Sequence, residues 1–247
     1  MKDILFYQLF EPQSSTYTYL IADMETKEAA IIDPVWETSD RDLKLIREHG
    51  LYLMYILETH IHADHITGAA EIRKNTMART ATSALAEIDC ADILLEDGHI
   101  LPLGNKKIQA IATPGHTSAC MSFLFEGMVF TGDSLLIRGT GRTDFQGGSA
   151  SKLYDSITQK LFSLPDETKV YPAHDYQGIT STTIALEKKL NPRIGNSRSK
   201  EDFKKIMEEL QLRAPKKMHL ALLANTSCGK LEVVRTMNWN EKSLPKE

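Results

Sequence analysis

The chain has 247 residues, a length that fits one large domain or two small ones, and a hydrophobic content of 42% suits an ordinary globular core. Lysine and arginine number 29 against 33 aspartates and glutamates, which gives a net charge of -4. Nucleic-acid-binding proteins usually carry a basic excess, so this balance argues against nucleic acid as a partner.

The cysteines and the N-terminal residues bear on the compartment. Cys90, Cys120 and Cys228 are odd in number, far apart in sequence and form no CxxC pair, which argues against a disulfide framework and for a reducing compartment. The first residues lack the features of a signal or transit peptide, and no stretch approaches the ~18 apolar residues of a membrane span. We therefore expect a soluble cytoplasmic protein with no membrane partner.

The first third of the chain is predicted to contain four strands and one helix. Residues 39–49 show helical periodicity, with Ser39 suited to the N-cap and Gly50 able to end the helix. Aromatic, β-branched and apolar runs predict strands at residues 4–10, 16–22, 28–33 and 51–57. The last of these strands runs directly into Glu58-Thr59-His60.

The rest of the chain continues with strands and then helices. Asp97-Gly98 and Gly104-Asn105 are hairpin-type signals between apolar runs, and Glu126-Gly127 joins two further strands. Strands are predicted at residues 107–112, 120–125, 128–131 and 168–171. Helices are predicted near residues 180–190, at 200–212, and after Gly147-Gly148, where a core-facing stripe is formed by Leu153, Ile157 and Leu161. No Pro/Gly/Ser linker divides the chain, so we expect one layered domain of two packed sheets with helices outside.

Four titratable residues follow directly on apolar strands and can converge at one edge of a sheet: His60, His116, Asp133 and His174. The strongest single motif is Thr59-His60-Ile61-His62-Ala63-Asp64-His65, because imidazole is the commonest protein ligand for metals and carboxylate its usual companion. The alternative is a polar loop before a helix, with Asp64 as the N-cap. The burial of this many titratable groups is costly without a metal, so metal binding is favoured.

Three later motifs are ambiguous when each is taken alone. Thr113-Pro114-Gly115-His116-Thr117 can aim an imidazole from a tight turn, although a lone histidine after a turn is more often simply exposed. In Phe130-Thr131-Gly132-Asp133-Ser134 the aspartate could instead cap a turn. Tyr171-Pro172-Ala173-His174-Asp175-Tyr176 is also ambiguous on its own. Their order after the histidine-rich motif is the informative feature.

The chain resembles the metallo-β-lactamase superfamily, and within it most closely the persulfide dioxygenases, over roughly residues 1–230. The narrower resemblance is carried by THIHADHITG (59–68), TGDSLLIRGTGRTDF (131–145), YPAHDY (171–176), LNPR (190–193) and NTSCG (225–229). It implies an αββα sandwich as a catalytic domain at residues 1–230, followed by a C-terminal tail of uncertain structure at residues 231–247.

The resemblance also implies one Fe(II) per chain, held by His60, His116 and Asp133, a set that leaves coordination positions open. His62, Asp64, His65 and His174 would orient the ligands and bound water, or would bind a second metal in a dinuclear relative. Arg142 and Tyr176 would serve as catalytic and substrate-binding residues, and Thr140 would also contact substrate. Thr140 stands where some relatives have cysteine, and the alternative for Arg142 is a structural ion pair with Asp144.

The implied reaction is the oxidation of glutathione persulfide with O2 and water to sulfite and glutathione, a step of sulfide oxidation. One alternative is a dinuclear zinc hydrolase of glutathione thioesters, like glyoxalase II, with metal-bound hydroxide as nucleophile. A second alternative is a metal- or persulfide-binding module without catalysis. A homodimer is conceivable, and sequence alone does not decide between one metal and two.

Overall fold

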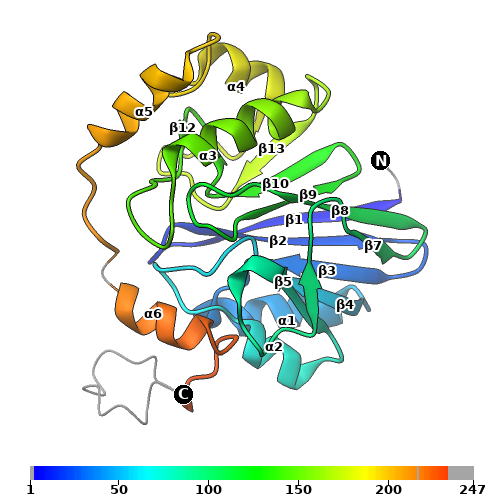
Figure 1. Cartoon of the computed structure of the whole chain (residues 1–247). Coiled ribbons are helices and arrows are strands. Elements are labelled where there is room, and N and C mark those ends of the chain that lie inside the picture. Colours follow the sequence, from blue (N-terminus) through cyan, green and yellow to red (C-terminus); the bar gives the residue numbers. More distant parts are fainter. Residues whose placement is uncertain (1–2, 216, 233–247) are drawn as a thin grey trace.

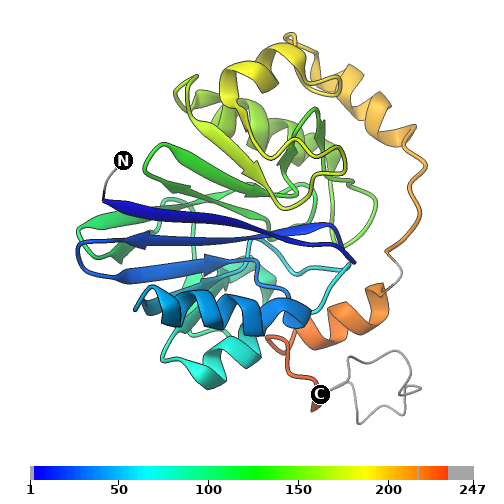
Figure 2. The ribbon, with the colours of Figure 1, turned by 180° about the vertical axis from the view of Figure 1, so that it is seen from behind.

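The computed structural model describes residues 3–215 and 217–232, and in it two six-stranded sheets pack face to face with helices on their outer sides (Figure 1). The view from behind shows the same layers, with α1 lying across the outer side of the first sheet (Figure 2). Among the described residues, no helix is long and apolar enough to cross a membrane.

The first sheet has the strand order β1-β2-β3-β4-β5-β6. Its strands are β1 (Ile4–Glu11), β2 (Thr16–Asp23), β3 (Glu28–Ile32), β4 (Tyr52–Leu57), β5 (Arg79–Ser83) and β6 (Ile93–Leu95). The first three strands pair antiparallel, and the pairs from β3 to β6 are parallel. Parallel pairs need crossover connections, and helices α1 (Ser39–Glu48) and α2 (Ala69–Asn75) supply two of them.

The second sheet has the order β14-β13-β10-β9-β8-β7. Its strands are β7 (Ile100–Leu103), β8 (Lys106–Ala112), β9 (Met121–Phe125), β10 (Met128–Gly132), β13 (Lys169–Pro172) and β14 (Thr182–Thr183). Its helical cover is α3 (Ala150–Asp155), extended by a π turn at Ser156–Lys160 and a 3-10 turn at Leu161–Ser163, then α4 (Ile184–Leu190) and α5 (Lys200–Glu208). The short pair β11 (Leu135–Leu136) and β12 (Gly139–Thr140) and helix α6 (Met218–Asn225) complete the main elements, with short 3-10 turns at Trp36–Thr38 and Ala84–Ala86.

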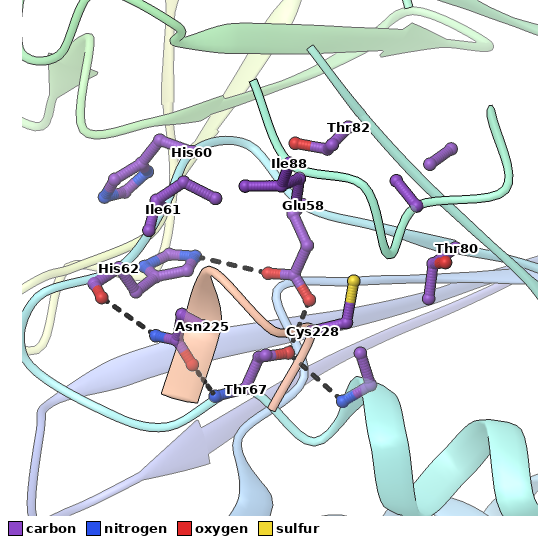
Figure 3. Close-up of a pocket in the computed structure, with 13 residues that line it drawn as sticks. Glu58, His60, Ile61, His62, Thr67, Thr80, Thr82, Ile88, Asn225 and Cys228 are labelled. Atoms are coloured by element: carbon purple, nitrogen blue, oxygen red, sulfur yellow. Dashed lines mark hydrogen bonds and ion pairs between the residues drawn. The ribbon is translucent and has the colours of Figure 1, made fainter. Parts of the chain in front are cut away.

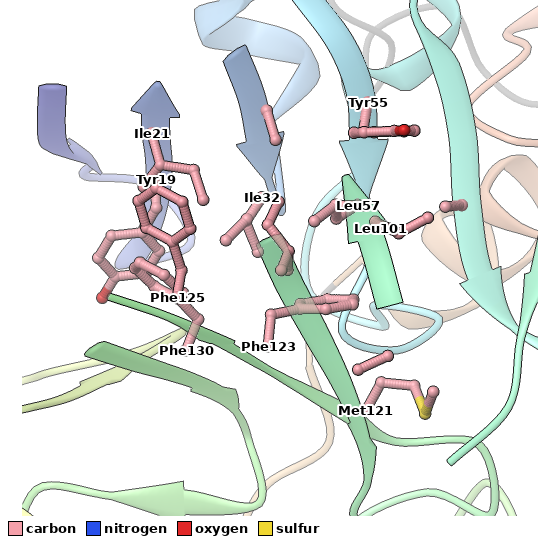
Figure 4. Close-up of a cluster of buried hydrophobic side chains, with 14 of the residues drawn as sticks. Tyr19, Ile21, Ile32, Tyr55, Leu57, Leu101, Met121, Phe123, Phe125 and Phe130 are labelled. Carbon is pink, nitrogen blue, oxygen red and sulfur yellow. The ribbon is translucent and has the colours of Figure 1, made fainter. Parts of the chain in front are cut away.

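The main core lies between the two sheets (Figure 4). Tyr19 and Leu57 from the first sheet and Phe123 and Phe130 from the second are all buried in it. The rings of Tyr19 and Phe130 lie 4.9 Å apart in a tilted arrangement, a favourable geometry for aromatic pairs. This apolar layer is a rigid base for the loops at the ends of the strands.

The sandwich predicted from the sequence is confirmed, and most predicted strands agree with the structure within two residues. The hairpin predicted at Asp97-Gly98 is wrong, because β6 and β7 belong to different sheets and the turn carries the chain between them. The helix predicted near 180–190 starts only after strand β14. The helices and strands for which no residue range was predicted are α2, β5, β6, β7, β11, β12, β14 and α6. Most of the predicted tail, residues 233–247, lies outside the described residues.

The interpretation of the cysteines also needs correction. Cys90 and Cys228 form a disulfide across a sequence separation of 138 residues, and Cys120 is free and buried. Distance along the chain did not exclude the bond, because the fold brings the end of α6 beside the segment before β6. The cysteine pattern therefore no longer supports a reducing compartment.

Candidate metal centre

The strand ends bring the predicted site residues to one edge of the sandwich. In the second sheet β8, β10 and β13 run in the same direction, so the residues that follow them emerge at one edge. These residues are His116, Asp133 and His174. The histidine-rich loop after β4 approaches the same edge from the first sheet and adds His60. The convergence predicted from the sequence is therefore confirmed.

His60, His116 and Asp133 form the first cluster. Each offers a ligand atom within 4.8 Å of the others, and both imidazoles are buried. Nε2 of His116 lies 3.6 Å from Oδ2 of Asp133, and the rings of His60 and His116 are perpendicular, with centroids 4.9 Å apart. Oδ1 of Asp133 is buried without a hydrogen-bond partner among the described residues.

Hydrogen bonds orient both imidazoles of the first cluster. Nδ1 of His116 lies 2.7 Å from the main-chain oxygen of Arg142, so Nδ1 must donate and Nε2 is left free to bind a metal. Thr59 Oγ1 donates to Asp33 Oδ2 at 2.7 Å and accepts from His60 Nδ1 at 3.0 Å. Burial lowers the pKa of His60 well below its usual value, which keeps this imidazole in the neutral form that a metal requires.

Close main-chain packing stabilises this cluster. A Cβ atom on Gly141 would lie 2.2 Å from the main-chain oxygen of Asp133 and 2.9 Å from Nδ1 of His116. Only glycine fits between these two residues. Gly132, at the end of β10, has a φ of +51°, and a Cβ there would meet Oγ1 of Thr59 at 2.5 Å. Gly132 of the TGDS motif and Gly141 of the RGTGRTDF motif thus allow the loops to approach one another.

A second cluster is formed by His62, Asp64 and His65, whose ligand atoms also lie within 4.8 Å of one another. His174 connects the two clusters, because its Nε2 lies 3.5 Å from Oδ2 of Asp64 and 3.6 Å from Oδ1 of Asp133. Its Nδ1 lies 3.0 Å from the main-chain oxygen of Ser15. All seven predicted metal-centre residues are therefore brought together.

His62 also faces away from the second cluster, toward two buried acids. Its Nε2 lies 3.1 Å from Oδ1 of Asp33. The same atom lies 3.7 Å from Oε2 of Glu58, as Figure 3 shows. Burial opposes the charged form of His62, but the carboxylates of Asp33, Asp64 and Glu58 outweigh it and raise the pKa to about 10. Burial has the opposite effect on the pKa of Glu58, because it disfavours the charged carboxylate and raises that pKa to about 8. The acids around His62 thus favour its protonated form.

The three residues predicted to contact substrate do not gather at one place as the metal-centre residues do. The Arg142 guanidinium forms a bidentate pair with Asp144 at 2.6 and 2.5 Å and donates to the main-chain oxygens of residues 212 and 213. Thr140 is buried, with Oγ1 directed at the main-chain oxygen of Gly141. Tyr176 is 74% exposed and its ring stacks on that of His174, with centroids 5.9 Å apart. Of these three, Tyr176 lies at the rim of the metal cluster.

Three buried residues of the site were not predicted from the sequence: Asp33, Glu58 and Asn225. Asp33 directly follows β3, just as His60 comes shortly after β4. The rule that polar residues after apolar strands converge therefore also applies to Asp33. Glu58 adjoins the histidine-rich motif and was assigned no role. Asn225 is the first residue of the NTSCG motif. That motif is part of the resemblance to the family, but no role was predicted for Asn225.

The donor set fits a metal ion. Two neutral imidazoles and one carboxylate are the arrangement of non-haem iron oxygenases, and three ligands on one face leave other positions open for substrate and O2. The unpartnered Oδ1 of Asp133 is the kind of buried atom that a bound cation satisfies.

Comparisons of the sequence and of the structure with known proteins agree with one another. Residues 12–174 match the profile described as the metallo-beta-lactamase superfamily. The proteins named persulfide dioxygenase ETHE1, mitochondrial, from Bos taurus and Homo sapiens are each 46% identical over 92% of this chain and 89% of their own length. The crystal structure of ETHE1 from Myxococcus xanthus is 50% identical, with a TM-score of 0.89, covering 92% of this chain and 100% of that chain.

Proposed function

The chain belongs to the metallo-beta-lactamase superfamily, and we propose that it is an iron-dependent persulfide dioxygenase that oxidises glutathione persulfide with O2 and water to sulfite and glutathione. The observation that carries this function is 46% identity over nine-tenths of the chain to proteins of that name, together with the His60–His116–Asp133 cluster. In this reaction the terminal sulfur loses the electrons that O2 accepts, and the sulfur–sulfur bond breaks to leave glutathione.

His60, His116 and Asp133 would hold one Fe(II). The bound ion supplies open coordination positions and the redox chemistry with O2, and its charge favours the deprotonated persulfide. Residues of the chain orient the ligands and hold protons near them. The main-chain oxygen of Arg142 and Oγ1 of Thr59 fix the two imidazoles so that each Nε2 faces the cluster. Nε2 of His174, between Asp64 and Asp133, can hold a proton against either carboxylate.

Substrate contacts are proposed for two residues near this cluster. Tyr176 stands at the rim beside His174, where its hydroxyl can donate a hydrogen bond to the persulfide or to the glutathione backbone. The planar guanidinium of Arg142 suits a carboxylate of glutathione, although its pairing with Asp144 means that substrate must compete with that acid. The buried position of Thr140 favours packing over substrate contact.

A dinuclear zinc hydrolase of glutathione thioesters is the second candidate, because His62, Asp64 and His65 form a further ligand group. The orientation of His62 toward Asp33 and Glu58 disfavours it. A homodimer and a cytoplasmic location stay predictions.

The test is oxygen uptake by anaerobically purified, iron-analysed protein on addition of glutathione persulfide. We expect uptake in proportion to iron content, with sulfite as product. No uptake by fully iron-loaded protein, together with hydrolysis of a glutathione thioester after zinc loading, would overturn the dioxygenase in favour of the hydrolase.

A further inference from the structure

The side-chain amide of Asn225 is held by the loop that carries the histidine-rich motif. Its Nδ2 donates to the main-chain oxygens of His62 and His65, both at 2.8 Å. Its Oδ1 accepts from the main-chain N–H of Thr67 at 2.9 Å, and Figure 3 shows this bond and the one to His62. The residue is 3% exposed. An amide has two donor hydrogens and one carbonyl oxygen, so both hydrogens and the oxygen are used.

These three bonds replace regular secondary structure in the loop. Residues 62–67 lie between β4 and α2, in neither a helix nor a strand, so their main-chain groups have few regular partners. Buried main-chain groups must find hydrogen bonds elsewhere, and Asn225 satisfies three of them at once. The segment it spans contains Asp64 and begins two residues after His60.

Helix α6, which carries Asn225, is itself anchored. Leu220 and Ala224 pack against Ile66 of the same loop in a small buried cluster. Lys217, just before the helix, pairs with Glu37 at 2.8 Å. Cys228, after the helix, is bonded to Cys90. Asn225 is thus presented from a fixed support at both ends of the helix.

We propose that Asn225 is a positioning residue of the metal centre: it fixes the path of residues 62–67, which carry His62, Asp64 and His65 and continue directly from the loop of the ligand His60. It touches no proposed ligand side chain and acts only through the main chain. The inference rests on the proposed metal site but not on the reaction performed there. Groups that orient metal ligands typically contribute about 10- to 100-fold to metal affinity.

The competing explanation is that Asn225 only fills space beneath the loop. Two near-isosteric variants separate the explanations. Asn225→Leu keeps the volume and removes all three hydrogen bonds, whereas Asn225→Asp keeps an acceptor for Thr67 and loses both donors. A filling role predicts little effect of the leucine. If Asn225 positions the loop, both variants should bind the metal less tightly.

The control is Leu103→Ala, at a fully buried residue of the edge strand β7 in the other sheet. Deletion of a buried leucine side chain leaves a cavity that destabilises the fold. Leu103 belongs to the core between the sheets, not to the buried cluster around Ile66. This variant therefore reports what general destabilisation alone does to metal binding.

The measurements are the rate of iron loss to a chelator and the ligand-field absorption of the cobalt(II)-substituted protein, at a temperature where circular dichroism shows every variant folded. We expect both Asn225 variants to lose iron about 10-fold or more faster than wild type and to show an altered cobalt spectrum. We expect Leu103→Ala to match wild type in both. Wild-type iron loss and spectrum in the Asn225 variants, or equal changes in Leu103→Ala, would overturn the inference. Iron retention without persulfide oxidation in wild type would instead count against the proposed function.

Discussion

Nδ1 of His116 lies 2.7 Å from the main-chain oxygen of Arg142, which follows it by 26 residues. This contact links the TPGHT motif to the RGTGRTDF motif and determines which imidazole nitrogen faces Asp133. The loop after β12 is therefore part of the metal centre, although none of its side chains belongs to the cluster.

Replacement of a proposed ligand should remove iron and activity together. His116→Ala or Asp133→Ala leaves only two of the three proposed ligands, and we expect neither variant to retain iron after purification or to consume O2 with persulfide. His99→Ala, in the exposed turn before β7, is the control and should retain both. The ligand assignment is wrong if either cluster variant keeps full iron content and full activity.

Gly141 should tolerate no side chain, whereas Gly139, two residues earlier, should. A Cβ at Gly141 would meet the main-chain oxygen of Asp133 at 2.2 Å, but one at Gly139 has no neighbour closer than 3.9 Å. We expect Gly141→Ala to lower the free energy of unfolding by about 1–3 kcal/mol and to lose iron. Gly139→Ala should keep its iron and change stability little. Chemical denaturation and iron analysis of the pair check this, and equal behaviour of the two variants would contradict it.

The convergence of ligands was predictable because it follows from a simple rule. β8, β10 and β13 run the same way, so polar residues after each of them meet at one edge. The rule needs only the ends of apolar runs, which the sequence shows clearly. The same rule also covers Asp33, which directly follows β3.

Other features depend on contacts between distant segments that carry no local pattern. Asn225 reaches the main chain of His65 across 160 residues. The orientation of His62 toward Asp33 depends on how β3 and β4 pair. The turn at Asp97-Gly98 carries the chain from one sheet to the other, and this depends on which sheet β6 and β7 join. Periodicity and turn propensity do not contain this information.

The two proposed roles of Arg142 predict different kinetics. If its guanidinium holds a carboxylate of glutathione, Arg142→Gln should raise KM about tenfold with iron content unchanged, a loss of about 1.4 kcal/mol. Asp144→Asn, which removes the competing acid but keeps the arginine, should leave KM the same or lower it. If Arg142 is only structural, both variants should lose stability by similar amounts, and KM should not distinguish them.

The cysteines give a prediction that uses no substrate. Cys90 and Cys228 are bonded, and burial raises the pKa of the remaining thiol, Cys120, to about 11. Protein purified without reductant should therefore show no reactive thiol when folded and one when unfolded. After reduction and unfolding, all three cysteines of the chain should react. Three thiols in unreduced, unfolded protein would show that the bond does not form.

The bond should also stabilise the fold, because it closes a loop of 138 residues and so restricts the unfolded chain. We expect Cys90→Ser to lower the free energy of unfolding by about 2–4 kcal/mol, measured by urea denaturation without reductant. Reduction of the wild type should produce a loss of the same size, and reductant should have no further effect on the variant. A variant as stable as the oxidised wild type would show that the packing of α6 against Ile66 is sufficient to hold the helix.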